Sequence, residues 1–129
     1  GINSKLGGLN FSECMIYSLN YQEIKNNNDR NDWDSTFQIV LDACKKLRDS
    51  GVSAIILCAN TMHYIADKLE QELDIPIIHI ADATALEIEK AGLKKVGLLG
   101  TKFTMELDFF RSRLLKKEIE TLIPDDEDR

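Results

Sequence analysis

The sequence is short of cysteine, and its three cysteines follow no recognised spacing. Cys14, Cys44 and Cys58 are far apart and irregularly placed. Such a set forms neither a disulfide framework nor a zinc-ligand pattern. We therefore expect no metal site, and we expect the reducing environment of the cytoplasm.

Long apolar runs and basic clusters are also missing. No apolar stretch approaches the roughly 18–20 residues that a membrane-spanning helix requires. No stripe of Lys and Arg offsets the formal net charge of −6, and an acidic balance disfavours binding to the phosphates of nucleic acids. We therefore expect neither a membrane nor a nucleic-acid partner.

The apolar residues that are present follow two alternating periodicities. Short runs rich in Val and Ile predict strands, and apolar residues spaced by three and four predict helices. The predicted strands are 13–19, 52–58, 76–80, 95–100 and 120–123; the predicted helices are 35–50, one beginning at 60–61, 82–91 and 104–117; 26–31 is a predicted loop. This alternation predicts an α/β fold with an open parallel sheet and flanking helices, a Rossmann-like or flavodoxin-like lobe.

The same patterns predict which side chains are buried. Asp34 or Ser35 is the expected cap of the helix over 35–50, and Gly51 is its expected stop. The strand over 52–58 is apolar throughout, which predicts burial on both faces. We also expect Cys14 inside a strand. Inward helix positions are predicted at Phe37, Val40, Leu41, Cys44, Leu47, Ile65, Leu69, Leu73, Leu107, Phe110 and Leu114, with Leu115 as a further candidate.

The most informative segment is 54–63, where an apolar run ends abruptly at polar side chains. The predicted strand ends at Cys58, and Asn60, Thr61 and His63 follow it. In an open α/β sheet, ligands bind in the loops beyond the carboxyl ends of the strands. One interpretation is therefore a proton-transfer and hydrogen-bonding site. The other is an ordinary capped helix, with Cys58 packed as a small apolar residue.

A second loop, over 100–104, also follows a predicted strand and leads into a helix. It carries Thr101 and Thr104. Hydroxyls and backbone N–H groups at helix starts suit a carboxylate or a phosphate, but Thr is also a common helix cap. Neither loop has the glycines of a dinucleotide site or the Lys-Ser/Thr pair of a Walker motif.

Three segments closely resemble the aspartate/glutamate racemase family, in particular its broad-specificity amino-acid racemases. They are Leu57-Cys-Ala-Asn-Thr-Met-His63, His79-Ile-Ala-Asp-Ala-Thr84 and Val96-Gly-Leu-Leu-Gly-Thr-Lys-Phe-Thr-Met-Glu106, supported by shorter matches at 6–9, 32–34 and 122–124. The resemblance implies two similar α/β lobes with the active site between them. It also implies chemistry without pyridoxal phosphate or metal, so no cofactor is expected. Two opposed groups, usually thiols, would exchange the α-proton of an amino acid.

The resemblance assigns roles to individual residues. The substrate carboxylate would be held by Asn60, Thr61, Thr101 and Thr104, and Asn28 and Ala59 would also contact the substrate. The first acid/base group usually stands directly before the Asn-Thr pair, where this chain has Ala59, with Cys58 one position earlier. Side chains alternate faces along a strand. Cys58 is therefore either the catalytic acid/base, if the loop has left strand geometry, or a packed thiol.

The two histidines have less direct interpretations. We expect His63 to support the site from behind or to lie on a helix surface, because it falls in the first helical turn after the predicted strand. We expect His79 to pack at the end of the strand over 76–80.

The resemblance also predicts the domain organisation. Residues 1–92 correspond to the first lobe without its opening strand, and 93–129 to the start of the second lobe, so we expect an internal piece of a longer protein that is inactive alone. A non-catalytic module that binds small carboxylates is the alternative, since Ala59 carries no ionisable group. We expect a homo-oligomer, because an incomplete lobe would expose apolar surface.

Overall fold

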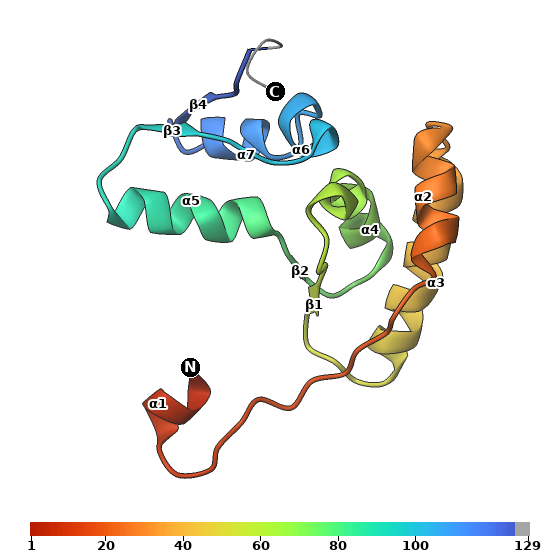
Figure 1. Cartoon of the computed structure of the whole chain (residues 1–129). Coiled ribbons are helices and arrows are strands. Elements are labelled where there is room, and N and C mark those ends of the chain that lie inside the picture. The colour runs from red at the N-terminus through yellow and green to blue at the C-terminus, as the bar shows by residue number, and fades with distance from the viewer. Residues whose placement is uncertain (126–129) are drawn as a thin grey trace. The chain divides into compact units, whose positions relative to one another are not determined.

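The computed structural model describes residues 1–125, which form two compact units: Gly1–Val52, and the residues from Ser53 onward (Figure 1). The first unit contains α1 (Ile2–Leu6), α2 (Tyr21–Asp29) and α3 (Trp33–Asp49). The second contains β1 (Ile55–Ile56), the 3₁₀ helix η1 (Asn60–Ile65), α4 (Ala66–Glu72), β2 (Ile77–Ile78), α5 (Ile80–Lys90), β3 (Lys95–Gly97), α6 (Lys102–Glu106), α7 (Arg111–Leu115) and β4 (Glu120–Leu122).

Helix α3 confirms the helix predicted over 35–50. Its cap is Asp32, slightly earlier than predicted, and the Asp32 carboxylate accepts a hydrogen bond from the Ser35 N–H at 3.1 Å. Gly51 ends the helix with a φ of +88°, a conformation that glycine adopts without strain. Of the five predicted inward residues, Phe37, Val40, Leu41 and Cys44 are buried and Leu47 is half-buried.

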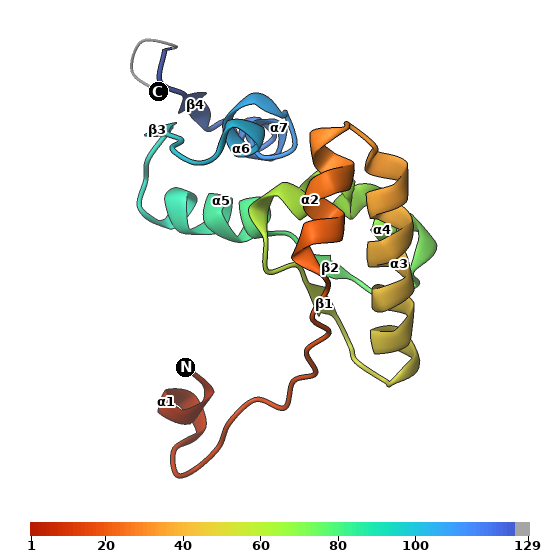
Figure 2. The same ribbon diagram turned by 45° about the vertical axis from the view of Figure 1, so that its right-hand side comes forward.

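Two predictions for the first unit were wrong. The loop expected over 26–31 is largely the end of α2, which lies beside α3 (Figure 2). Asn has low helix propensity, but Asn27 and Asn28 are buried here and hydrogen-bonded to Arg30 and Thr36. No strand forms over 13–19, because the described part of this unit holds only helices for it to join; Cys14 is exposed.

The second unit has the predicted parallel pairing. Ile55 and Ile56 of β1 pair with Ile77 and Ile78 of β2, and β3 pairs with β4 in the same parallel sense. Parallel strands with helices between them confirm the α/β class. The strands form two small sheets of two strands each, however, rather than one larger sheet.

The prediction that β1 is buried on both faces was wrong. Ile55 is 4% exposed and Ile56 is 65% exposed. Successive side chains of a strand point to opposite faces, and only the face that carries Ile55 is covered. In this strand, a continuous apolar run therefore does not mean that both faces are buried.

The helix predicted over 104–117 is divided into α6 and α7. Residues next to each other in a helix point in different directions, whereas Phe109 and Phe110 both pack inward. Phe110 joins a core with Ala81, Ala85, Leu114 and Ile119, and Phe109 packs against that core. The break after Leu107, whose backbone is extended (φ −75°, ψ 139°), allows both rings to reach the interior. The inward position considered for Leu115 was wrong, since it is 69% exposed.

Helix α4 and η1 keep the predicted core positions, since Ile65, Leu69 and Leu73 are all buried. Every helix within residues 1–125 is too short or too polar to cross a membrane. The predicted lobe boundary between 92 and 93 stays a prediction, and residues 126–129 of the predicted second lobe lie outside the described residues.

Candidate functional site

The loop after β1 presents its polar residues to solvent. Cys58, Ala59 and Asn60 are exposed and Thr61 is half-buried. Ala59 has an extended backbone (φ −145°, ψ 124°) and occupies the cap position of η1, so the predicted cap at Asn60 or Thr61 was wrong. The first turn is closed by the backbone instead, because the Met62 N–H donates to the Ala59 carbonyl at 3.1 Å.

Exposure separates the three thiols. Cys44 lies in the core as predicted, and burial raises the pKa of its thiol. Cys58 is exposed, so it is not the packed thiol of the alternative interpretation. An exposed thiol at a strand end can reach a ligand, although its catalytic role stays a prediction.

The loop after β3 is held by its own threonines. Thr101 caps α6: its hydroxyl accepts from the Thr104 N–H at 3.4 Å and lies 3.2 Å from the Thr104 hydroxyl. Thr104 is buried, and a Cβ on Gly100 would lie 3.2 Å from the Thr104 side chain. The capping role is therefore confirmed for Thr101 but not for Thr104, which lies inside α6, while substrate binding by these hydroxyls stays a prediction.

The two loops are connected only indirectly, through the helices that follow them. Strands β1 and β3 belong to different sheets, so the loops do not share one sheet edge as expected. Helix α6, which Thr101 caps, nevertheless contacts η1, which begins at Asn60. This helix contact is compatible with a site shared by the two loops, which stays a prediction.

Asn28 belongs to the first unit and is committed to an internal contact. Its side chain is buried in α2, and its carbonyl oxygen accepts a hydrogen bond from the Thr36 hydroxyl at 2.8 Å. This bond joins α2 to α3. The predicted substrate contact of Asn28 stays a prediction.

Behind the first loop, His63 and His79 form a buried pair. Their ring centroids are 4.5 Å apart, with the planes at 67°. The surface position considered for His63 was wrong, since it is 2% exposed; the packing role predicted for His79 agrees with its burial. His79 also caps α5, because its Nδ1 accepts from the Ala81 N–H at 3.1 Å.

Burial makes both imidazoles hard to protonate. Burial, with the positive charge of Arg113 and the neighbouring His63 ring, lowers the pKa of His79 from 6.5 to about 4. Burial likewise lowers the pKa of His63, against the opposing effect of the Ala59 and Asn60 carbonyls. A charged imidazole loses more hydration on burial than a neutral one, so both rings are neutral near pH 7.

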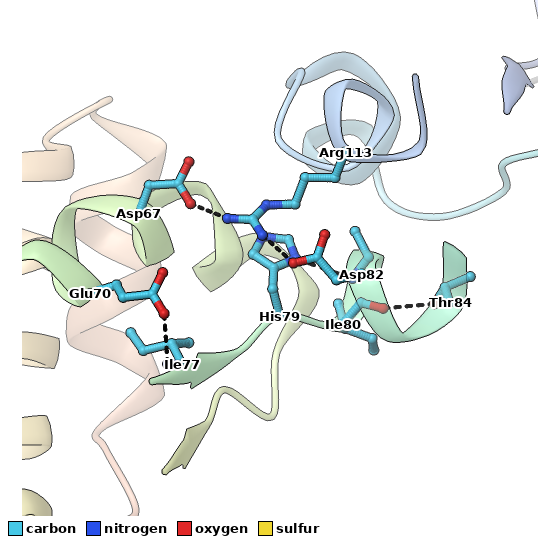
Figure 3. Close-up of polar contacts among 9 residues, drawn as sticks. Asp67, Glu70, Ile77, His79, Ile80, Asp82, Thr84 and Arg113 are labelled. Carbon is cyan, nitrogen blue, oxygen red and sulfur yellow. Dashed lines mark hydrogen bonds and ion pairs between the residues drawn. The ribbon is translucent and has the colours of Figure 1, made fainter. Parts of the chain in front are cut away.

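Arg113 is a structural residue that the sequence did not reveal. Its guanidinium lies between two carboxylates and pairs with Asp67 of α4 and Asp82 of α5 (Figure 3). It thereby links α7 to the helices on either side of β2. Its partners are 46 and 31 residues away in the sequence, beyond the reach of any local pattern.

Across residues 1–125, no group of three or more His, Cys, Asp or Glu side chains is arranged to hold a metal ion. The polar side chains of the two loops are the Asn60 amide, the Thr hydroxyls, the Cys58 thiol and the Lys102 ammonium. These groups suit an organic anion with an exchangeable proton better than a cation.

Comparison with known proteins decides the family. The model of the Asp/Glu/hydantoin racemase family matches residues 6–129. The chain belongs to this family. The resemblance seen in the sequence motifs is thus confirmed.

Individual relatives agree with this assignment. The chain is 32% identical over 83 residues to the broad specificity amino-acid racemase RacX of Bacillus subtilis (strain 168), and 31% identical over 103 residues to a glutamate racemase of Leptospira borgpetersenii. A crystal structure from Yersinia pestis, described as a candidate Asp/Glu racemase, superposes with a TM-score of 0.93 at 42% identity. An aspartate racemase homologue from Pyrococcus horikoshii OT3 gives 0.85 at 38% identity.

The chain is much shorter than these relatives. The matches cover 64% and 78% of this chain but 36% and 40% of the two curated racemases. The two crystal structures cover 99% and 98% of this chain, which spans 56% of each.

Proposed function

We propose that this chain supplies one half of the active site of an amino-acid racemase that acts on aspartate, glutamate or a related amino acid. The observation that carries the proposal is the exposed Cys58 thiol next to the Asn60-Thr61 turn, in a chain of this family. The thiol can exchange a proton, and the turn offers amide and hydroxyl donors to a carboxylate.

The proposed reaction is a proton exchange without a cofactor. The Cys58 thiolate takes the proton from Cα and becomes a thiol, and the electron pair left on carbon is delocalised into the α-carboxylate. Donors from Asn60, Thr61, Thr101 and Thr104 hold that carboxylate and stabilise its added negative charge. A second acid on the opposite face of Cα then donates a proton, which inverts the centre.

A second candidate function is supported by Ala59. The family resemblance places the first acid/base group at this position, and alanine cannot transfer a proton. In this alternative the loops bind a small carboxylate or amino acid without reaction. Calorimetric titration with aspartate and glutamate distinguishes the two candidates, because binding without proton exchange favours the module.

The test is Cα–H exchange of L-aspartate and L-glutamate in deuterium oxide, followed by NMR and chiral analysis, using the full-length protein. We expect exchange with inversion, and a loss of at least about a hundredfold for Cys58→Ala, the scale of acid–base catalysis. Cys14→Ala is the matched control, since it removes another exposed thiol. Unchanged substrate would contradict the enzyme proposal, and activity that survives Cys58→Ala would assign the base elsewhere.

The chain of 129 residues should not invert substrate on its own. In the proposed mechanism the second acid comes from another lobe, so a lone Cys58 has no opposed partner. Racemisation by this chain alone would contradict the two-lobe assignment.

A further inference from the structure

The side chain of His63 turns back onto the loop that carries the proposed acid/base. Its Nδ1 lies 3.1 Å from the Ala59 carbonyl oxygen and 3.2 Å from the Asn60 carbonyl oxygen. These two peptide units join Ala59 to Thr61, directly after Cys58. His63 itself is buried, so it contacts the loop from the protein interior rather than from the solvent side.

The contacts fix the tautomer of the ring. Carbonyl oxygens only accept hydrogen bonds, so Nδ1 must carry the proton. The other ring nitrogen, Nε2, is buried and has no hydrogen-bond partner. A proton on Nε2 would therefore be an unsatisfied buried donor, whereas a bare lone pair there costs less.

The groups around the ring also favour the neutral form. The His79 ring lies next to it at the end of β2. The Arg113 guanidinium of α7 acts on it electrostatically and is paired with the Asp82 carboxylate of α5. A charged His63 would face a second imidazole and a permanent cation. The neutral ring with hydrogen on Nδ1 satisfies the loop carbonyls without this repulsion.

We propose that His63 is a positioning residue, whose Nδ1–H holds the Ala59 and Asn60 carbonyls and so sets the direction in which Cys58 and Asn60 present their side chains. The loop-holding role stands on these contacts alone; its catalytic consequence rests on the proposed function. Besides this imidazole donor, the Ala59 carbonyl accepts the backbone bond from the Met62 N–H.

The first test needs no variant. The ¹⁵N shifts of the His63 ring in the wild-type chain distinguish the two neutral tautomers and the cation. We expect a proton on Nδ1 and none on Nε2 at pH 7. A ring protonated on Nε2, alone or together with Nδ1, would overturn the proposal.

The second test compares two amides of different reach. Asn at position 63 places its N–H₂ near the site of Nδ1, and Gln places it near the site of Nε2. The readout is hydrogen exchange at the Met62 amide, whose acceptor is the Ala59 carbonyl. We expect His63→Gln to accelerate this exchange by about three- to tenfold, the effect of one lost hydrogen bond, and His63→Asn by less than about twofold.

The Leu98 amide is the internal control. It donates to the Leu122 carbonyl at 2.7 Å in the other sheet, away from the loop. Equal acceleration at Met62 and Leu98 would mean general destabilisation and would overturn the positioning role, as would identical behaviour of the Asn and Gln variants. Neither test uses activity, so a full-length protein without racemisation would sink the proposed function and leave this inference standing.

Discussion

Because the imidazole of His79 is buried, it makes the stability of the folded chain depend on pH. Its pKa is about 4 in the folded chain and 6.5 when unperturbed. Between these values the unfolded chain binds a proton that the folded chain does not, so stability falls as the pH decreases. The contribution is fully present above pH 6.5 and is lost progressively down to about pH 4.

We expect acidification from pH 7 to pH 4 to cost the folded state on the order of 3 kcal/mol through this residue. Urea unfolding followed by circular dichroism at several pH values measures it. His79→Asn is the informative variant, because Asn can still cap α5 and does not titrate. An unchanged pH dependence in that variant would show that His79 is not responsible.

At this scale the sequence predicted residue types better than their environments. The positions of Asn60 and Thr61 after a strand were correct, as was burial of His79, whereas Cys58, predicted as the last residue of that strand, lies beyond the end of β1. Neighbouring residues of a strand face opposite sides, and the apolar run does not indicate on which side Cys58 lies. Its exposure could therefore not be predicted. The buried contact of His63 with the loop was also missed, since a histidine in a first turn has no distinctive pattern.

Local sequence patterns predicted the features that lie within one helix, but not the features that depend on tertiary contacts. The periodicity of α3 predicted its face and its glycine stop, because both are properties of a single helix. The division between α6 and α7 depends on two aromatic rings that pack inward together, and the buried asparagines of α2 depend on Thr36 and Arg30. Such contacts join segments that a local window does not compare.

Arg113 provides the prediction at this scale. Its side chain is 17% exposed and pairs with two carboxylates that are 71% and 53% exposed. We expect Arg113→Gln to lower the free energy of unfolding by about 1–2 kcal/mol, since each half-exposed pair contributes up to about 1 kcal/mol. Double-mutant cycles with Asp67→Asn and Asp82→Asn measure the two couplings.

Lys90→Gln is the matched control for Arg113. It breaks the pair with Glu87, in which both side chains are at least 70% exposed, and we expect less than about 0.5 kcal/mol. An equal loss in both variants, or coupling energies near zero for Arg113, would show that the guanidinium does not join the three helices.

For the whole molecule, the α/β class and the parallel pairing could be predicted, and the sheet arrangement could not. Strand order is set by which strands pair, and this depends on tertiary contacts. Here β1 pairs with β2 and β3 pairs with β4, in separate sheets. The consequence is uncovered apolar surface: Ile56 and Ile78, neighbours in the register of β1 and β2, are 65% and 49% exposed.

We expect this face to promote the self-association that the sequence suggests. Light scattering of the chain should show species larger than a monomer, and the pair Ile56→Thr with Ile78→Thr should shift the distribution toward the monomer. Leu99→Thr is the control, because it removes another exposed apolar side chain outside β1 and β2. A monomeric wild-type chain, or an equal shift in the control, would contradict this expectation.

The Ala59 carbonyl accepts from both the Met62 N–H and the His63 ring, while its side chain is exposed on an extended backbone. Because this turn is held through its backbone carbonyl oxygens, the side chain at position 59 can be replaced without changing the fold of the loop. A single substitution there can therefore move the acid/base group. In a full-length Cys58→Ala background, Ala59→Cys should therefore restore deuterium incorporation at Cα, and a double variant as inert as Cys58→Ala alone would show that the scaffold does not tolerate the relocated thiol.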